Sequence, residues 1–288
     1  ILVILIKLMM TLWQGLCHLP TSWHPAIGKL CGKLLLVFAG SRKKIAQANL
    51  ALCFPNLSKM EQQKLLRDNF VYLGRSLIET GIAWFWSDQK IQSQINYEII
   101  GLGLLLANDS NKGNLIIFKH SQHLELDARL LAMNAPMYGV SRSHNSASMN
   151  KIQDKGRLSS LKDTADKNNP RKFMKWLKSG KNVLYAIDQD YGWDHSVRLN
   201  FFQQEAATIT TTKKIIDATN SNLLFINSYY ENNKLILKME LIDHLELDST
   251  ALAQKINDIM EEKILLHPAE YLWIHRRFKS TLGKNFYK

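Results

Sequence analysis

The chain has 288 residues, enough for one large domain or for a domain with an appendage. Its 37 Lys and Arg residues against 25 Asp and Glu give a formal net charge of +12, a balance that suits an anionic membrane surface, nucleic acid or an acidic protein partner. The three cysteines, Cys17, Cys31 and Cys53, form no CxxC pair, so neither a cysteine zinc site nor a disulfide framework is supported.

The amino-terminal segment is strongly apolar. Residues 1–19 carry a single charge, Lys7. About twenty such residues span the hydrocarbon core of a bilayer, and no small-x-small signal-peptide cleavage site follows them. Lys and Arg residues soon after this segment place the rest of the chain in the cytoplasm by the positive-inside rule. We therefore predict a membrane anchor helix over residues 1–24, with a helix lying deep in the interface as the alternative.

Residues 25–96 are predicted to form amphipathic helices close to the membrane. Lysines interspersed with apolar residues suit helices at a membrane surface, where long side chains reach the polar layer. Pro55 interrupts the pattern, and Ser58 with Glu61 three residues later indicates a capping box at the next helix start. Trp84 and Trp86 end this section as interfacial anchors or as core residues.

From residue 97 the pattern becomes α/β. Strands are predicted at 97–101, 114–119, 136–141, 182–187, 222–229 and 234–241. Helices are predicted near 102–107, 124–133, 146–160, 170–179, 206–218 and 250–265. This alternation favours a mainly parallel central sheet flanked by helices over residues 97–288.

The stretch NLIIFKHSQHLELDAR, residues 114–129, carries the most informative pattern. A short apolar run ends at His120, and a helical pattern follows it, so His120 is predicted to lie at the carboxyl end of a strand. Sites collect at this edge of open α/β sheets. A neutral imidazole there can take a proton from a hydroxyl, and a carboxylate such as Glu125 can hold its tautomer. The alternative is a His that caps the helix and a Glu that complements its dipole.

A metal site is a second interpretation of the same stretch. His120, His123, Glu125 and Asp127 have side chains of the kinds that bind zinc or non-haem iron. However, HxxH lacks the HExxH spacing that puts two His residues one helical turn apart. We therefore favour acid/base chemistry, and keep a membrane-tethered metallohydrolase acting on lipid headgroups through His120, His123 and Asp127 as the alternative.

Three further candidate site residues lie between positions 140 and 160. Arg142 and Asn145 follow a predicted strand, and Arg157 falls near the end of the next helix. Arginines at such positions can hold phosphates or an oxyanion, although a lone arginine is more often a solvated cation.

Polar residues also follow a later strand and mark the carboxyl end. Asp188 and Asp190 could bind a cation, orient a substrate hydroxyl or cap turns. Arg276 belongs to a basic aromatic string that could bind phosphate headgroups or nucleic acid. A non-catalytic binder of anionic lipid or nucleic acid is thus a third interpretation. Walker, GxGxxG and GxSxG strings do not occur in the sequence.

Several strings resemble one family in the order in which they occur. They are KKIAQANLALCFPNLS, LIETGIAWFW, HSQHLE, the Arg142 segment, GR at 156–157, YAIDQDYG and EYLWIHRRFK. Together, from about Lys43 to Lys279, they resemble the late (secondary) acyltransferases of lipid A biosynthesis in Gram-negative bacteria. HSQHLE matches that family's His-x4-Asp/Glu motif. Ser143 and Ile187 stand where the family usually has Pro, which leaves the acyl-chain length and the acceptor position open.

The resemblance implies a glycerolipid-acyltransferase-like fold and a specific reaction. A fatty acyl group moves from acyl carrier protein to a 3-hydroxyl on an acyl chain of a Kdo-containing lipid A precursor, at the cytoplasmic face of the bacterial inner membrane. It implies no cofactor, no metal and no nucleic-acid partner.

The resemblance also implies roles for the candidate residues. His120 is the expected general base, Glu125 orients it, and Arg157 stabilises the thioester oxyanion or holds a phosphate. The expected substrate-binding residues are Arg142, Asn145, Asp188, Asp190 and Arg276.

Overall fold

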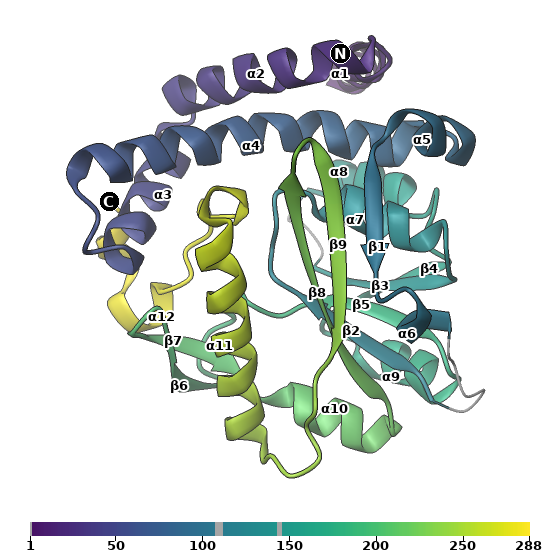
Figure 1. Ribbon diagram of the computed structural model, residues 1–288, viewed down its shortest axis with the longest axis vertical. Coiled ribbons are helices and arrows are strands. Elements are labelled where there is room, and N and C mark those ends of the chain that lie inside the picture. The colour runs from purple at the N-terminus through teal and green to yellow at the C-terminus, as the bar shows by residue number, and fades with distance from the viewer. Residues whose placement is uncertain (1, 107–111, 143–145) are drawn as a thin grey trace.

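A central seven-stranded sheet organises the chain in the computed structural model, which describes residues 2–106, 112–142 and 146–288 (Figure 1). The strand order is β1-β9-β8-β2-β5-β3-β4. Strands β8, β2, β5, β3 and β4 run parallel, while β9 pairs antiparallel with β8 and parallel with β1. The strand bounds are β1 Tyr97–Ile100, β2 Asn114–Phe118, β3 Met137–Ser141, β4 Asp163–Asp166, β5 Asn182–Ala186, β8 Asn222–Glu231 and β9 Lys234–Leu241. The predicted mainly parallel sheet flanked by helices is confirmed.

Three strands escaped prediction. The edge strand β4 buries one residue, Ala165, and so shows no apolar run. Strands β6, Ser196–Phe201, and β7, Gln204–Ile209, form a separate antiparallel hairpin. The helix predicted over 206–218 is therefore wrong at its start, because 206–209 belong to the hairpin, and α10 begins only at Thr211.

Helices cover both faces of the sheet (Figure 1). All six helices predicted after residue 97 are present, with ends that differ from the predicted ones. The bounds are α1 Leu2–Cys17, α2 His24–Phe38, α3 Gly40–Cys53, α4 Lys59–Phe85, α5 Asp88–Gln94, α6 Gly103–Leu106, α7 Leu124–Ala132, α8 Ala147–Arg157, α9 Pro170–Lys178, α10 Thr211–Thr219, α11 Ser249–Leu266 and α12 Lys279–Leu282, with 3-10 turns at Thr21–Trp23, Pro268–Glu270 and Lys284–Tyr287. The predicted capping box of Ser58 and Glu61 starts α4.

The membrane anchor predicted over residues 1–24 is not supported. Helix α1 ends at Cys17, a 3-10 turn follows, and α2 begins at His24. Among the helices of the described ranges, none combines the length and the apolar character needed to cross a membrane.

Helix α2 lies along α4 at one side of the molecule, and α1, seen nearly end-on in Figure 1, packs against α4 at the same side. Glycines allow the close crossing of α2 and α4. A Cβ at Gly74 of α4 would meet the backbone oxygen of Gly28 at 2.1 Å and the backbone nitrogen of Gly32 at 2.3 Å. This spacing holds the outward-facing side of α2 at a fixed height above α4.

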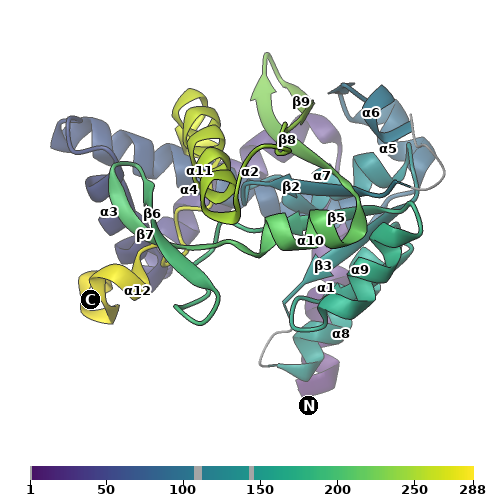
Figure 2. The same cartoon turned by 90° about the horizontal axis from the view of Figure 1, so that it is seen from below.

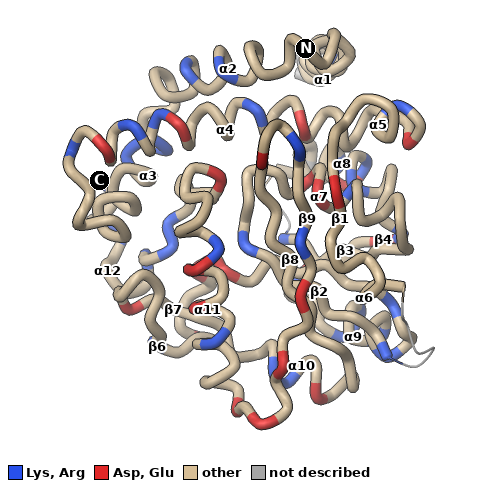
Figure 3. The backbone as a smooth tube through the Cα atoms, in the orientation of Figure 1, with Lys and Arg blue, Asp and Glu red and all other residues tan. Residues whose placement is uncertain are grey.

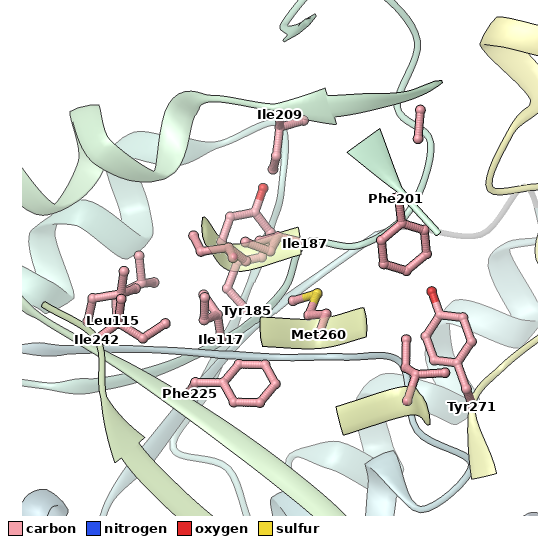
Figure 4. Close-up of a cluster of buried hydrophobic side chains, with 14 of the residues drawn as sticks. Leu115, Ile117, Tyr185, Ile187, Phe201, Ile209, Phe225, Ile242, Met260 and Tyr271 are labelled. Atoms are coloured by element: carbon pink, nitrogen blue, oxygen red, sulfur yellow. The ribbon is translucent and has the colours of Figure 1, made fainter. Parts of the chain in front are cut away.

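The two faces of the sheet carry separate cores, because side chains alternate along each strand. Ile116 and Leu184 pack with Ile78 and Ile82 of α4 and with α7. Leu115, Ile117, Tyr185 and Phe225 face the other way, towards α9, α10, α11 and the hairpin (Figure 4). Both cores end near the carboxyl edge of β2, β5 and β3, where the chain leaves a cavity.

Candidate active site

A cavity of about 580 Å³ lies at the carboxyl edge of β2, β5 and β3. Leu124, Ala128, Leu161 and Leu184 line an apolar part between the sheet and α7. The polar lining includes His120, Glu125, Arg142, Arg157, Lys167 and His275. One part of the cavity lining therefore suits a hydrocarbon chain, and the other part is polar and strongly basic.

The register of β2 and β5 places His120 beside Asp188. Phe118 and Ala186 are paired at the ends of these parallel strands, and the chain continues for two residues from each. The backbone N–H of His120 donates to Asp188 Oδ2 at 2.9 Å, and Nδ1 of the ring bonds to Oδ1 of the same carboxylate. Two bonds to one buried carboxylate thus fix both the backbone and the ring of His120.

Burial by itself would raise the pKa of the Asp188 carboxyl. The facing charge of His120 and hydrogen bonds from His120 and Tyr271 outweigh burial and hold this pKa well below its usual range. Whenever the His120 imidazole is neutral, an ionised Asp188 keeps its proton on Nδ1. The ring side chain is 16% exposed, and among the described residues Nε2 has no hydrogen-bond partner, so it is available to accept a proton.

His275, which also lines the cavity, stays uncharged. Burial chiefly, with repulsion from His120, lowers its pKa to about 3. It therefore adds a polar group to the cavity without adding a positive charge beside His120.

Glu125 does not form the hydrogen bond to His120 that the sequence predicted. It lies in the first turn of α7, and its Oε1 accepts from Arg157 Nε at 3.0 Å while its Oε2 accepts from Trp84 Nε1 at 2.9 Å. The described residues form no hydrogen bond between His120 and Glu125. Both side chains still line the same cavity, with Glu125 bonded to Arg157 and His120 bonded to Asp188.

A glycine brings Arg157 to this place. Gly156, the preceding residue in α8, packs so closely against Trp84 that a Cβ would meet the indole carbons at 2.2–2.6 Å. Packing against Trp84 therefore explains why the first residue of the GR pair at 156–157 is a glycine.

A buried ionic cluster supports the turn that carries His120. The Nδ1 and Nε2 atoms of His123 each lie 2.8 Å from a carboxylate oxygen, of Glu79 and Glu270 respectively. Burial alone would lower the pKa of His123, but the two carboxylates raise it to about 9. Arg75 and Tyr230 complete the bonding of Glu79. His123 is thereby a structural cation, which explains why the HxxH pattern is not a ligand pair.

The metal interpretation is accordingly unsupported. Both ring nitrogens of His123 face carboxylates, and Asp127 accepts from Ser121 and Ser228. Across the residues that the structure describes, no three His, Cys, Asp or Glu side chains come together in a way that could hold a metal ion.

The remaining candidates are distributed unevenly. Arg142 lines the cavity, whereas Asn145 lies outside the described residues. Asp190 accepts from the backbone N–H of Gly192 at 3.0 Å, as its turn-capping alternative predicted. It also accepts from the backbone and hydroxyl of Ser280, both at 2.6 Å, and so fastens this loop to α12. Arg276 is half-buried and is not part of the cavity lining.

Sequence reasoning missed several lining residues and the true partner of His120. Trp84 was predicted at an interface or in the core, Arg42 only as one of the cations after the amino-terminal segment, and His275 only as part of the basic aromatic string. The partner could have been found, because β2 and β5 were both predicted and each is followed, two residues on, by a polar residue. What was missing was the knowledge that these two strands are neighbours.

Comparisons with known proteins agree on one family. The profile of a family described as bacterial lipid A biosynthesis acyltransferase matches residues 2–280. The lipid A biosynthesis lauroyltransferase of Escherichia coli K12 is 36% identical over 267 residues, 89% of this chain and 86% of that protein. The palmitoleoyltransferase of the same organism is 34% identical over 88% of this chain and 84% of its own length. A lipid A biosynthesis acyltransferase of Haemophilus influenzae is 33% identical over 93% and 88%.

Proposed function

The chain belongs to the bacterial lipid A biosynthesis acyltransferase family, and from this membership we propose the reaction that its cavity performs. It is an O-acyltransferase of lipid A biosynthesis. The proposed donor is the thioester of acyl carrier protein. The proposed acceptor is a 3-hydroxyl on an acyl chain of a Kdo-containing lipid A precursor.

His120 is the proposed general base. Its Nε2 takes the proton of the acceptor hydroxyl as the hydroxyl oxygen attacks the thioester carbonyl carbon. The tetrahedral intermediate then expels the carrier thiolate, which receives the proton from His120, so the base is restored. Asp188 holds the tautomer and stabilises the imidazolium that forms, and general base catalysis of this type contributes on the order of a hundred- to ten-thousandfold.

Arg157 is proposed to stabilise the oxyanion of this intermediate. Its bonds to Glu125 fix the guanidinium plane in the cavity, and preorganised cations of this kind act strongly where water is excluded. Arg142, on the lining of the same cavity, is proposed to hold an anionic part of a substrate.

The apolar part of the cavity is proposed to take an acyl chain. Leu124, Ala128, Leu161 and Leu184 surround it, and Gly139 adds no side chain beyond the sheet surface. A Cβ at Gly139 would come within 2.9 Å of a Leu161 methyl group, so little spare room remains at this point. Burial is worth about 0.8 kcal/mol per methylene, which makes such a pocket selective for chain length.

Helices α1 and α2 are proposed to rest in the cytoplasmic surface of the inner membrane. Large apolar side chains are exposed along these two helices and on the 3-10 turn between them, namely Ile4, Leu8, Met9, Leu12, Leu16, Trp23, Leu30, Leu34, Val37 and Phe38. Lys29 and Lys33 are exposed between the apolar residues of α2, as is typical of a helix lying in an anionic interface. Such attachment would hold the cavity close to an acceptor that stays in the bilayer.

The bond between His120 and Asp188, with Nε2 left towards the cavity, is the observation that carries this proposal. Its test is mass spectrometry of lipid A from cells that contain the chain, lack it, or contain His120→Ala. We expect the unmodified chain to add one or more acyl groups of defined mass and the folded variant to add none. Normal acylation by a stable His120→Ala protein would overturn the proposed mechanism.

A further inference from the structure

One helix beside the cavity presents a row of cations to solvent. Residues 151–181 contain ten Lys or Arg and three Asp, and α9 itself contains no acidic residue. Arg171, Lys175 and Lys178 are exposed and follow the spacing i, i+4, i+7, so they share one side of α9. Phe173 and Leu177 are buried on the other side of the helix. Figure 3 shows the backbone at Lys and Arg residues in blue. We call Arg171, Lys175 and Lys178 the α9 basic row.

Stabilisation of the fold does not explain the α9 basic row. Lys178 complements the negative carboxyl end of the helix, but Arg171 lies in the first turn, where the helix dipole disfavours a cation. In the described part of the chain none of the three forms an ion pair, whereas their neighbour Lys172 pairs with Asp163. The row thus keeps like charges together without an internal acidic partner.

The α9 basic row begins four residues after a residue of the cavity lining. Lys167 lines the cavity and comes three residues before the first residue of α9. Burial chiefly, and then repulsion from Arg142, lowers the pKa of Lys167, which indicates that the two cations lie close together. At about 1.5 Å per residue α9 extends the positive surface by roughly 13 Å from this point. A partner lying along α9 could therefore reach the cavity with a flexible group.

The position of α9 argues against a bilayer as the partner. Helices α1 and α2 lie along one side of the molecule, and α9 and α10 lie towards the opposite side (Figure 1). The view turned by 90° agrees, with α9 near the viewer and α1 and α2 behind the sheet (Figure 2). A flat membrane that receives the apolar side of α1 and α2 cannot also contact the α9 basic row.

We propose that the α9 basic row docks an acidic surface of the protein that carries the acyl donor. This inference rests on the proposed function, since it assumes a protein-bound thioester. Charge complementarity at such a rim steers encounter and orientation more than it adds to tight binding, which suits a carrier that must leave after each transfer.

The test is steady-state transfer by the full chain from lauroyl-acyl carrier protein and from lauroyl-pantetheine, a donor without the protein. In Lys175→Glu/Lys178→Glu we expect KM for the carrier-bound donor to rise about tenfold at low salt, as the loss of two exposed charge contacts implies. The ratio of KM for the two donors should change by the same factor. Added salt should raise KM for the carrier in the unmodified chain more than in the variant.

The matched control is Lys59→Glu/Arg67→Glu, which reverses two exposed cations of α4, and we expect it to leave the KM ratio unchanged. If the α9 reversal does not fold, Lys175→Gln/Lys178→Gln should still raise the ratio about threefold. An unchanged ratio with normal transfer contradicts the docking surface alone. Loss of binding to phosphatidylglycerol vesicles without a change in the ratio also overturns it and assigns the row to lipid. Absence of acyl transfer from any donor by the unmodified chain contradicts the proposed function instead.

Discussion

At the scale of single residues, the pairing of His120 with Asp188 is set by strand register rather than by spacing along the chain. The two residues are far apart in sequence, and each lies two positions beyond a paired strand end. Local spacing suggested Glu125, because it is the next carboxylate of a recognisable motif. In the structure Glu125 bonds to Arg157 instead. The His-x4-Glu motif therefore contributes one residue to each of two pairs, His120–Asp188 and Glu125–Arg157.

The substitution Asp188→Asn tests whether His120 depends on Asp188 rather than on Glu125. An amide would donate to Nδ1 of His120 and leave the proton on Nε2, which then cannot accept the acceptor proton. We expect kcat to fall by two to four orders of magnitude with little change in KM. The measurement is steady-state transfer with purified chain.

Asp190→Asn is the matched control, since Asp190 lies two residues further on and bonds to Ser280. We expect it to weaken folding but to leave kcat within a few fold. A variant with Asn at position 188 that keeps full kcat would show that His120 does not depend on this carboxylate.

At the scale of elements, the helix crossing of α2 and α4 depends on backbone contact. A side chain at Gly74 has no room, because the atoms that it would meet belong to the backbone of α2. The apolar side of α2 is therefore presented at a position that side-chain rearrangement cannot easily change.

Gly74→Ala should lower the free energy of unfolding by about 1–3 kcal/mol, because overpacking outweighs the better helix propensity of alanine. Gly40→Ala provides the comparison, since a Cβ there has no neighbour within 4 Å. We expect that control to be neutral or slightly stabilising. Chemical denaturation of both variants measures the difference, and equal stability of the two would contradict the close crossing.

Asparagines connect elements in a way that the sequence pattern did not indicate. Asn49 of α3 donates to the backbone oxygens of Trp273 and His275, and Asn69 of α4 does the same for Tyr271. At the opposite edge of the sheet, Asn114 bonds to Asn182 of the neighbouring strand. Long apolar strands and amphipathic helices could be predicted because their period is local. The edge strand β4, the hairpin and these polar links could not, because each depends on a distant neighbour.

At the scale of the whole molecule, the cluster around His123 joins four separate parts of the chain. Glu79 comes from α4, His123 precedes α7, Tyr230 lies in β8 and Glu270 in the 3-10 turn after α11. Its charged members Glu79, His123 and Glu270 are buried, so their charges are held by one another rather than by water. Its charge state should therefore affect the stability of the fold as a unit.

We expect stability to fall as the pH rises from about 6.5 to 8. The folded pKa of His123, about 9, exceeds the unfolded value of 6.5, so its contribution is fully present below pH 6.5 and is lost as the pH approaches and passes 9. Within this window the folded chain binds a proton that the unfolded chain has released, which corresponds to on the order of 1 kcal/mol per pH unit.

Thermal unfolding of the unmodified chain and of His123→Asn across this range measures the effect. The variant should unfold at a lower temperature at pH 6.5 and should lose most of the pH dependence. Identical slopes for the two proteins would mean that His123 is neutral in the folded state. Lys119, whose pKa burial lowers to about 8, adds a counteracting gain above pH 8, so the window ends there.

One wall of the cavity also imposes an order of events during synthesis. Arg42 of α3 donates to the backbone oxygen of Ile274, Asn49 donates to the backbone oxygen of His275, and the backbone N–H of Leu272 donates to the oxygen of His120. Arg42 and Asn49 therefore wait for residues made more than two hundred positions later, and His120 waits for one made about 150 positions later, before the cavity is enclosed. Because contacts of such separation form slowly, the apolar lining stays uncovered while the ribosome is still at work, and a nascent chain cannot begin acylation before its last wall has emerged.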